Sequence, residues 1–174
     1  MRHLFLFRRP EDSLVSFYHF HCRPSGNQKL TTGGVDSFCL EHLGRWKAMT
    51  HSYLELAMRC ATRVHFVSYE DMLSEPEQNL AHCFSWLGET VDAQIIAEAV
   101  ERNRFERAQK NESSRQTDPN HNFFRRGTSG AGQDELSQKT LDRIHAETSE
   151  LMKQARSRIA SKSRFASVGQ SSAA

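Results

Sequence analysis

The sequence has no long hydrophobic run and no strong charge of either sign. Its only N-terminal apolar run is Leu4–Phe7, which is far too short for a signal-peptide core or a membrane span. The net charge is only +2, so no overall electrostatic field favours nucleic acid as a partner. These absences predict a soluble chain that binds neither a membrane nor nucleic acid.

Cysteine pairs with redox or metal-binding spacing are also missing. The four cysteines lie far apart with no Cys-x-x-Cys motif, at Cys22, Cys39, Cys60 and Cys83. This pattern predicts reduced, mostly buried thiols in a cytoplasmic protein, not a disulfide framework. No metal is expected either, because the segment HFHC offers only the helical i,i+3 pair His19–Cys22 and no second pair.

Two short apolar runs predict β-strands, and they define the fold class. Leu4–Phe7 and Val64–Tyr69 are rich in β-branched, leucine and aromatic residues and have little polar alternation. Such strands are typical of a parallel sheet covered by helices on both faces. The 174 residues suffice for one domain with a real core. We therefore predict an α/β domain with a parallel sheet.

Helical spacing of apolar residues predicts about six helices between and after the strands. Gly44 should interrupt one of them, the SEPE segment from Ser74 should form a capping box, and Gly88 should end a helix in the left-handed conformation. Thr90 and Ser137 are expected to cap later helices. The predicted ranges are Pro10–Phe20, Val35–Leu43, Trp46–Cys60, Ser74–Leu87, Thr90–Arg102, and a final helix from Ser137 to about Ala155.

The C-terminal segment has a different composition from the rest of the chain. From Leu151 onward there are five basic residues and no acidic one. Such a tail could touch RNA or an anionic surface, but it has almost no interleaved aromatic residues, so a solvated tail is the preferred interpretation. We expect residues 155–174 to form a disordered basic tail and residues 1–154 to form the folded domain.

The segment Arg8–Phe20, RRPEDSLVSFYHF, combines features that suit an anion. Two arginines follow the first predicted strand, and Pro10 favours a helix start directly after them. Guanidinium groups and a helix N-terminus are suited to a phosphate. The alternative is a solvated basic loop between two core elements. The histidine on the last predicted helix, His145, is interpreted as a core residue.

The irregular segment Arg104–Asp134 carries a second basic cluster. Phe123 and Phe124 stand beside Arg125, Arg126 and Gly127, in a region broken by Pro119 and glycines. A merely solvated linker needs no aromatic residues beside paired arginines. This loop is therefore a second candidate for ligand binding.

Together, these blocks resemble the cytosolic sulfotransferase family, whose enzymes use 3′-phosphoadenylyl sulfate (PAPS). RRPEDSLVSFYHF resembles the segment that binds the donor's 3′-phosphate, VHFVSYEDM with SEPEQNLAHCFSWLG resembles a strand–helix unit of the family, and FFRRG resembles the loop over that phosphate. NRFERAQKN lies at the family's adenine-contacting position. The resemblance runs from about Leu4 to Met152, and the donor-binding residues that it implies are Arg8, Ser16, Tyr69, Asn103, Phe105, Arg125, Arg126 and Gly127.

Several parts of the family pattern are missing from the sequence. There is no Gly-x-x-x-x-Gly-Lys-Ser/Thr or Lys-Ser-Gly-Thr segment for the 5′-phosphosulfate, and the family's catalytic histidine has no counterpart. TSGAGQD also replaces the family's Gly-Asp-Trp-Lys continuation after Gly127. The chain therefore resembles the C-terminal portion of a sulfotransferase domain truncated at its N-terminus, with a P-loop-like parallel sheet. No catalytic residue can be assigned.

The resemblance implies transfer of a sulfuryl group from PAPS to a hydroxyl or amine acceptor, with no metal. The chain is then a member or a remnant of that enzyme family, and the acceptor is not defined by the sequence. The expected partners are a small-molecule acceptor and a complementing N-terminal half or a second copy of the chain. The alternative is a non-catalytic module that binds 3′-phosphoadenosine nucleotides or a partner protein.

Overall fold

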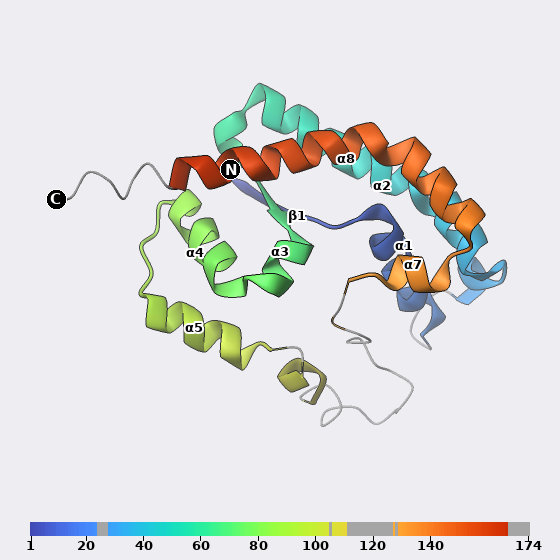
Figure 1. Ribbon diagram of the computed structural model, residues 1–174, viewed down its shortest axis with the longest axis horizontal. Coiled ribbons are helices and arrows are strands. Elements are labelled where there is room, and N and C mark those ends of the chain that lie inside the picture. The colour runs from blue at the N-terminus through green and yellow to red at the C-terminus, as the bar shows by residue number, and fades with distance from the viewer. Residues whose placement is uncertain (24–27, 105, 111–126, 128, 167–174) are drawn as a thin grey trace. The chain divides into compact units, whose positions relative to one another are not determined.

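The computed structural model describes residues 1–23, 28–104, 106–110, 127 and 129–166 (Figure 1). These residues belong to two compact units. The first comprises Met1–Arg8, Lys47–Ile96 and Glu147–Ala174, and the second comprises Arg9–Trp46 and Ala97–Ala146.

The described elements are two strands, two 3₁₀ turns and several α-helices. In chain order they are β1 (His3–Phe7), α1 (Pro10–Cys22), η1 (Gln28–Thr31), α2 (Gly34–Arg59), η2 (Ala61–Arg63), β2 (Val64–Ser68), α3 (Tyr69–Ser74), α4 (Pro76–Leu87), α5 (Ala93–Arg102), α7 (Ala131–Glu135) and α8 (Gln138–Ala166).

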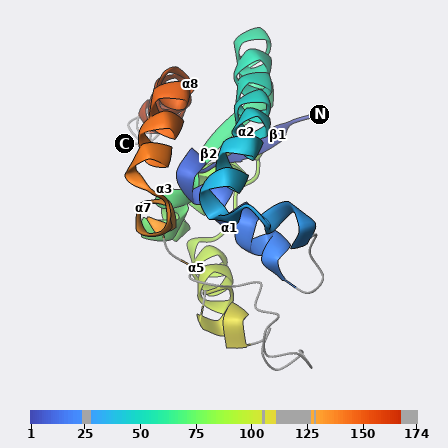
Figure 2. The same ribbon diagram turned by 90° about the vertical axis from the view of Figure 1, so that its right-hand side faces the viewer.

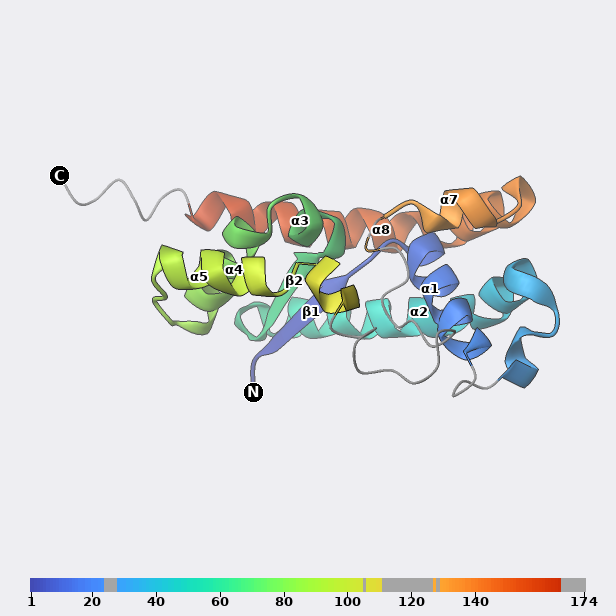
Figure 3. The same ribbon diagram turned by 90° about the horizontal axis from the view of Figure 1, so that it is seen from below.

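Strands β1 and β2 form a parallel two-stranded sheet in the first unit (Figure 3). The register pairs His3 with Val64 and Phe7 with Ser68. Both strands lie where the apolar runs predicted them, and the long connection between them contains helices, as a parallel pair requires. The prediction of an α/β fold with a parallel sheet is confirmed.

The core of the first unit is built around Phe5 of β1. Its ring stacks on that of Tyr53 with centroids 4.3 Å apart, and it meets Phe66 of β2 edge-on at 5.1 Å. All residues of β2 are buried, as predicted for an interior strand. In β1, by contrast, Leu4 and Leu6 are 48% and 54% exposed. The prediction that both strands are covered on both faces is therefore wrong for β1.

The core of the second unit is built around Phe38 of α2. Its ring stacks on the imidazole of His42 at 4.1 Å and contacts Phe17 of α1 at 5.4 Å. Val15 of α1 and Ile144 of α8 are fully buried in the same unit. Apolar residues at helical spacing thus form this core, as the sequence indicated.

Helix α2 is continuous across Gly44, so the predicted interruption is wrong (Figure 2). A Cβ at Gly44 would meet no atom within 4 Å, and this exposed glycine has no structural demand on it. Glycine costs a helix about 1 kcal/mol relative to alanine. Burial of Leu43 and Trp46 on either side outweighs that cost.

Two predicted helix caps are also wrong. Ser74 is the last residue of α3, where its hydroxyl donates to the Asp71 carbonyl, so it does not begin the next helix. That helix, α4, begins at Pro76 without a side-chain cap, and it ends at Gly88 with φ 87°, as predicted. Near the start of α5, the carboxylate of Asp92 accepts the Gln94 N–H at 2.7 Å, in place of the predicted Thr90 cap.

The last helix begins as predicted and ends later. The Ser137 hydroxyl accepts the Thr140 N–H, which confirms that cap. Helix α8 then continues to Ala166, well beyond the expected end near Ala155. The sequence also gave no sign of the short helix α7 within the segment predicted to be irregular.

Candidate functional site

Arg8 and Tyr69 come together at the end of the sheet in the first unit. Arg8 directly follows β1, and Tyr69 begins α3 directly after β2. Because the strands are parallel, their carboxyl ends meet at one edge. The Arg8 guanidinium lies over the Tyr69 ring, with its carbon 4.3 Å from the ring centroid. Two residues that the resemblance assigned to the nucleotide are thus in direct contact.

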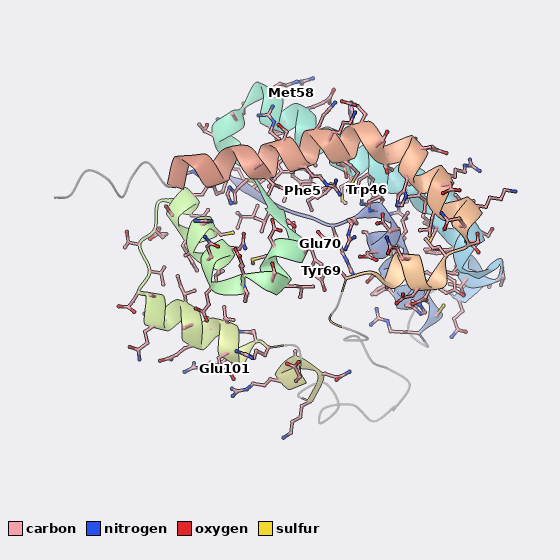
Figure 4. The ribbon with its side chains drawn as sticks, in the orientation of Figure 1. Phe5, Trp46, Met58, Tyr69, Glu70 and Glu101 are labelled. Carbon is pink, nitrogen blue, oxygen red and sulfur yellow. The ribbon has the colours of Figure 1, made fainter. Side chains whose placement is uncertain are left out.

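The turn from β2 into α3 is held by Ser68. Its Oγ accepts the Asp71 N–H at 3.1 Å and lies 3.2 Å from Glu70 Oε2, to which it donates. Figure 4 shows Tyr69 and Glu70 side by side at the start of α3. The cap therefore fixes the backbone that carries Tyr69.

Ser16 lies in α1, on an exposed position of the second unit. Pro10 occupies the first turn of this helix, as predicted, and Arg9 precedes it with extended backbone angles. Glu11 and Asp12 in the first turn are buried, with exposed fractions of 4% and 0%. Helix α1 therefore presents Ser16 to solvent while its acidic first turn faces protein.

The sequence did not indicate what the buried Asp12 does. Its two carboxylate oxygens accept the N–H groups of Gly130 and Gly132, both at 2.8 Å. Gly130 directly precedes α7, which is the short helix that the sequence missed. The signal in the sequence that could have drawn attention to Asp12 is the acidic pair Glu11–Asp12 directly after Pro10.

The other candidate residues are less completely described. Asn103 follows α5 and is exposed, and its side-chain amide donates to the Ala99 carbonyl at 2.8 Å. Gly127 has φ 62°, a left-handed conformation suited to glycine. Phe105, Arg125 and Arg126 lie outside the described residues. Their assignment to the nucleotide stays a prediction.

The histidine-rich end of α1 contacts an acidic side chain and other rings. No group of three or more metal-ligating side chains occurs among the residues that the structure describes. His19 Nε2 instead lies 2.5 Å from Glu135 Oε2. Burial lowers the pKa of His21, and the nearby His42 and Arg45 lower it further.

His145 is not the core residue that the sequence suggested. Its side chain is 51% exposed, and its Nε2 lies 3.8 Å from Oε1 of the buried Glu11. The helical stripe on α8 is instead filled by Leu141, Ile144 and Thr148, which are all buried. His145 lies at the edge of that stripe.

Two further groups of the second unit titrate away from their ordinary range. Burial alone raises the pKa of Asp36, but hydrogen bonds from Thr140 and Ser137 outweigh it and lower the pKa overall. Burial, with a contribution from Asp36 and Glu135, raises the pKa of the Cys39 thiol to about 12. Cys39 is therefore a protonated core thiol and not a nucleophile.

All four cysteines are free thiols, and Cys39 and Cys83 are buried. Within the described ranges, no helix has the combination of length and apolar character that spanning a membrane would require.

Comparison with known proteins identifies the family. Residues 1–156 match the family described as "Sulfotransferase domain". The chain is 24% identical over 156 residues to Sulfotransferase 1C2 of Rattus norvegicus. The matched region covers 81% of this chain and 51% of the relative. The chain thus spans about half the length of that curated relative.

Solved structures show the same fold at low sequence identity. The crystal structure of mouse sulfotransferase SULT7A1 complexed with PAP is similar to 96% of this chain, with 63% of its own length covered, a TM-score of 0.72 and 20% identity. Retinol dehydratase in complex with androsterone and inactive cofactor PAP matches 87% of this chain and 47% of its own, with a TM-score of 0.64 and 18% identity. The chain therefore contains part of the sulfotransferase fold, and the match over residues 1–156 shows that it belongs to the sulfotransferase family.

Proposed function

We propose that this chain binds the 3′-phosphoadenosine nucleotide of a sulfotransferase reaction, in which PAPS is the sulfuryl donor and a hydroxyl or amine is the acceptor. The observation that carries the proposal is the Arg8–Tyr69 pair at the carboxyl edge of the parallel sheet. Ligands of open α/β sheets bind at that edge. Two of the structural relatives were solved with PAP, which supports the same class of ligand.

The chemistry of the pair fits a phosphorylated nucleotide. The planar guanidinium of Arg8 can donate two parallel hydrogen bonds to phosphate oxygens. The Tyr69 ring holds that guanidinium in place, since it lies 4.3 Å from the ring centroid. Tyr69 in turn belongs to a helix start that is fixed by Ser68. An arginine that is oriented in advance loses less side-chain entropy when it binds the phosphate.

The remaining donors of the proposed site are assigned by the resemblance. The resemblance assigns the exposed hydroxyl of Ser16 and the backbone N–H of Gly127, which both belong to the second unit, to the 3′-phosphate. Bound PAPS would contribute the activated sulfuryl group itself. The residues of this chain would bind and orient the nucleotide end of that molecule, and none of them is assigned a role in proton transfer.

Calorimetric titration with two nucleotides tests the proposal. Adenosine 3′,5′-bisphosphate should bind more tightly than AMP, because only the former carries a 3′-phosphate. Hydrogen bonds to charged groups contribute about 1.5–3 kcal/mol each. Replacement Arg8→Ala should therefore weaken the bisphosphate by roughly tenfold or more and leave AMP almost unchanged.

The matched control is Arg2→Ala, at the residue directly before His3, where the same strand begins. Arg2 also lies over an aromatic ring, that of Trp86 at 5.6 Å, and it donates to the carbonyls of Trp86 and Leu87. It precedes β1, whereas Arg8 follows it. The control should leave the nucleotide preference intact. Equal affinity of the unmodified chain for both nucleotides would refute the proposal.

A second candidate function is a nucleotide-binding module without turnover. The same Arg8–Tyr69 geometry fits it, and the sequence contains no Lys-Ser-Gly-Thr segment. Transfer of radiolabelled sulfate from PAPS to a panel of phenols, alcohols and amines separates the two functions. We also propose a cytoplasmic location, which the four free thiols favour.

A further inference from the structure

Asp12 is a fully buried carboxylate whose role the nucleotide proposal leaves open. Its exposed fraction is 0%, and it lies in the first turn of α1. Oδ2 accepts the Gly130 N–H and Oδ1 accepts the Gly132 N–H, each at 2.8 Å, across 118 and 120 residues of sequence. The Arg9 Nε lies 3.8 Å from Oδ2. A buried charge with this set of partners holds two distant segments together within the second unit.

The same contact requires glycine at two positions. A Cβ on Gly132 would lie 2.6 Å from both Cβ and Cγ of Glu11, which is too close for any real side chain. Gly130 has φ 102°, a conformation that L side chains rarely adopt. The backbone around Gly132 therefore packs directly on α1, and the Asp12 carboxylate fixes where it lies.

Helix α7 depends on these contacts for its position. A helix of five residues is not stable alone, since helix formation has a costly nucleus. Asp12 anchors its beginning, and His19 anchors its end through Glu135, with Nε2 and Oε2 2.5 Å apart. Both anchoring side chains come from α1. The position of α7 is thus set by α1 at both ends.

The anchored segment begins close to a residue of the proposed nucleotide site. Gly127 precedes Gly130 by three residues, and three residues span at most about 11 Å even when fully extended. Ser16 follows Asp12 by four residues, so the two neighbour each other along α1 at about 6 Å. The carboxylate that holds Gly130 therefore also limits how far Gly127 can lie from Ser16.

We propose that Asp12 is a positioning residue for the 3′-phosphate. By accepting the Gly130 and Gly132 N–H groups, it fixes the Gly127 backbone near the face of α1 that carries Ser16, and the two donors address the same phosphate group. Asp12 itself does not touch the nucleotide. This inference rests on the proposed function, and it assigns the chain's discrimination of the 3′-phosphate to a buried contact outside the site.

Replacement Asp12→Asn tests this role, since it keeps the size of the side chain and removes its charge. One amide NH₂ group would then face a backbone N–H, so at least one of the two bonds is lost. The measured quantity is the ratio of the Kd for AMP to the Kd for adenosine 3′,5′-bisphosphate. We expect this ratio to fall at least tenfold, with the Kd for AMP within twofold of the unmodified chain.

Asp36→Asn is the matched control. The Asp36 carboxylate also accepts a backbone N–H from a distant segment of the second unit, that of Ser137 at 3.0 Å, together with its hydroxyl. Both substitutions remove a buried or half-buried acceptor and should lower the thermal transition. Only Asp12→Asn should change the nucleotide ratio. A loss of stability in both variants with an unchanged ratio would mean that Asp12 is merely structural.

A second variant covers the case in which Asp12→Asn fails to fold. His19→Gln removes the imidazole that contacts Glu135 at the other end of α7, and it leaves the Asp12 bonds in place. The side chains of His19 and Glu135 are only 30% and 19% exposed. It should lower the same ratio by a smaller factor. Amide hydrogen exchange at Gly130 and Gly132 should accelerate strongly in Asp12→Asn and only weakly in His19→Gln.

The outcomes separate this inference from the proposed function. An unmodified chain that binds both nucleotides equally refutes the proposed function and the phosphate role of Asp12 together. A chain that prefers the bisphosphate, with the same preference in Asp12→Asn and in His19→Gln, overturns only the role of Asp12. Faster exchange at Gly130 and Gly132 without a change in the ratio leads to the same conclusion.

Discussion

Strands β1 and β2 have the same length and lie in register, yet they differ in burial. Leu6 and Val67 are register partners on one face of the sheet, and their exposed fractions are 54% and 6%. Trp86 of α4 stacks on His65 of β2 at 5.3 Å, on that same face. Leu4, the register partner of His65, is 48% exposed. Helix α4 thus covers β2 on a face where β1 stays exposed.

The strand–helix junctions that follow the strands differ in the same sense. After β2, Ser68 caps the start of α3 through the Asp71 N–H. After β1, the residue at the cap position is Arg9, and it makes no side-chain cap. Thus the β2 junction is stabilised by its own residues, whereas the β1 junction has basic residues where a cap would stand. Both strands consist mainly of apolar residues, but only β2 is buried along its whole length.

The largest expected effect is a difference between a substitution at a buried position of β2 and one at an exposed position of β1. Phe66 is 2% exposed in β2, so Phe66→Ala should lower the free energy of unfolding by about 3–5 kcal/mol. Leu6→Ala in β1 should change it by no more than about 0.5 kcal/mol, as exposed positions do. Urea denaturation measures both. Equal losses would show that β1 is as well packed as β2.

The elements that the sequence predicted correctly are those with a local signal. The apolar runs indicated both strands, Pro10 marked the start of α1, and Gly88 marked the end of α4. Family membership followed from three separate blocks of residues. Each of these features depends on residues close together in the chain, so the sequence was sufficient.

The errors arose where distant residues decide the structure. Gly44 lies within α2 because the core contacts on either side keep the helix intact, and Ser74 belongs to α3 because Ser68 already starts a helix there. The bond from Asp12 to Gly130 joins residues more than a hundred positions apart. The exposure of Leu4 depends on which other segments cover the sheet, and the local sequence pattern does not reveal that. The spacing of apolar residues indicates which side chains favour burial, but it does not show whether another segment covers them.

The second prediction concerns a partner strand that would pair with β1. We propose that the complementing partner is a polypeptide with the N-terminal part of a sulfotransferase domain, which would add a strand along the edge of β1 opposite β2; among the described residues, the sheet contains only these two strands. A fragment present at roughly 100 times its Kd should stabilise the chain by about 2.7 kcal/mol. Thermal denaturation with and without the N-terminal part of rat Sulfotransferase 1C2 measures this shift.

The control for complementation is the same fragment with proline in its central strand. Proline removes a ladder hydrogen bond and is excluded from central strands, so this variant should give no shift. A stabilisation that both fragments produce equally would mean that strand pairing is not the cause. The shift in thermal denaturation should persist in Leu6→Ala and disappear when Leu6 is replaced by a charged residue. That pair of results would locate the contact on β1.

The third prediction concerns the two junctions. Ser68→Ala should cost about 0.5–2 kcal/mol of stability, because it removes an N-cap whose Oγ accepts the Asp71 N–H. The matched substitution in the first turn of α1 is Ser13→Ala, in a helix without a side-chain cap at its start, and it should stay within about 0.5 kcal/mol. Chemical denaturation of both variants provides the comparison. A larger loss in Ser13→Ala would reverse the proposed difference between the junctions.

The smallest expected effect on stability, and the sharpest test of the exposed face, comes from Leu6→Lys. Leu6 is more than half exposed, so a charge there should change the free energy of unfolding by no more than about 0.5 kcal/mol.

The same charge should reduce self-association, because lysine on an edge strand opposes pairing with a second chain. Light scattering over a range of protein concentrations measures this. Leu73→Lys is the control, since Leu73 is 42% exposed but lies in helix α3 and not in a strand, and it should leave association unchanged. If the unmodified chain is a monomer at every concentration, or if both lysine variants reduce association equally, then the exposed face of β1 is ordinary surface and the contrast with β2 has no consequence for assembly.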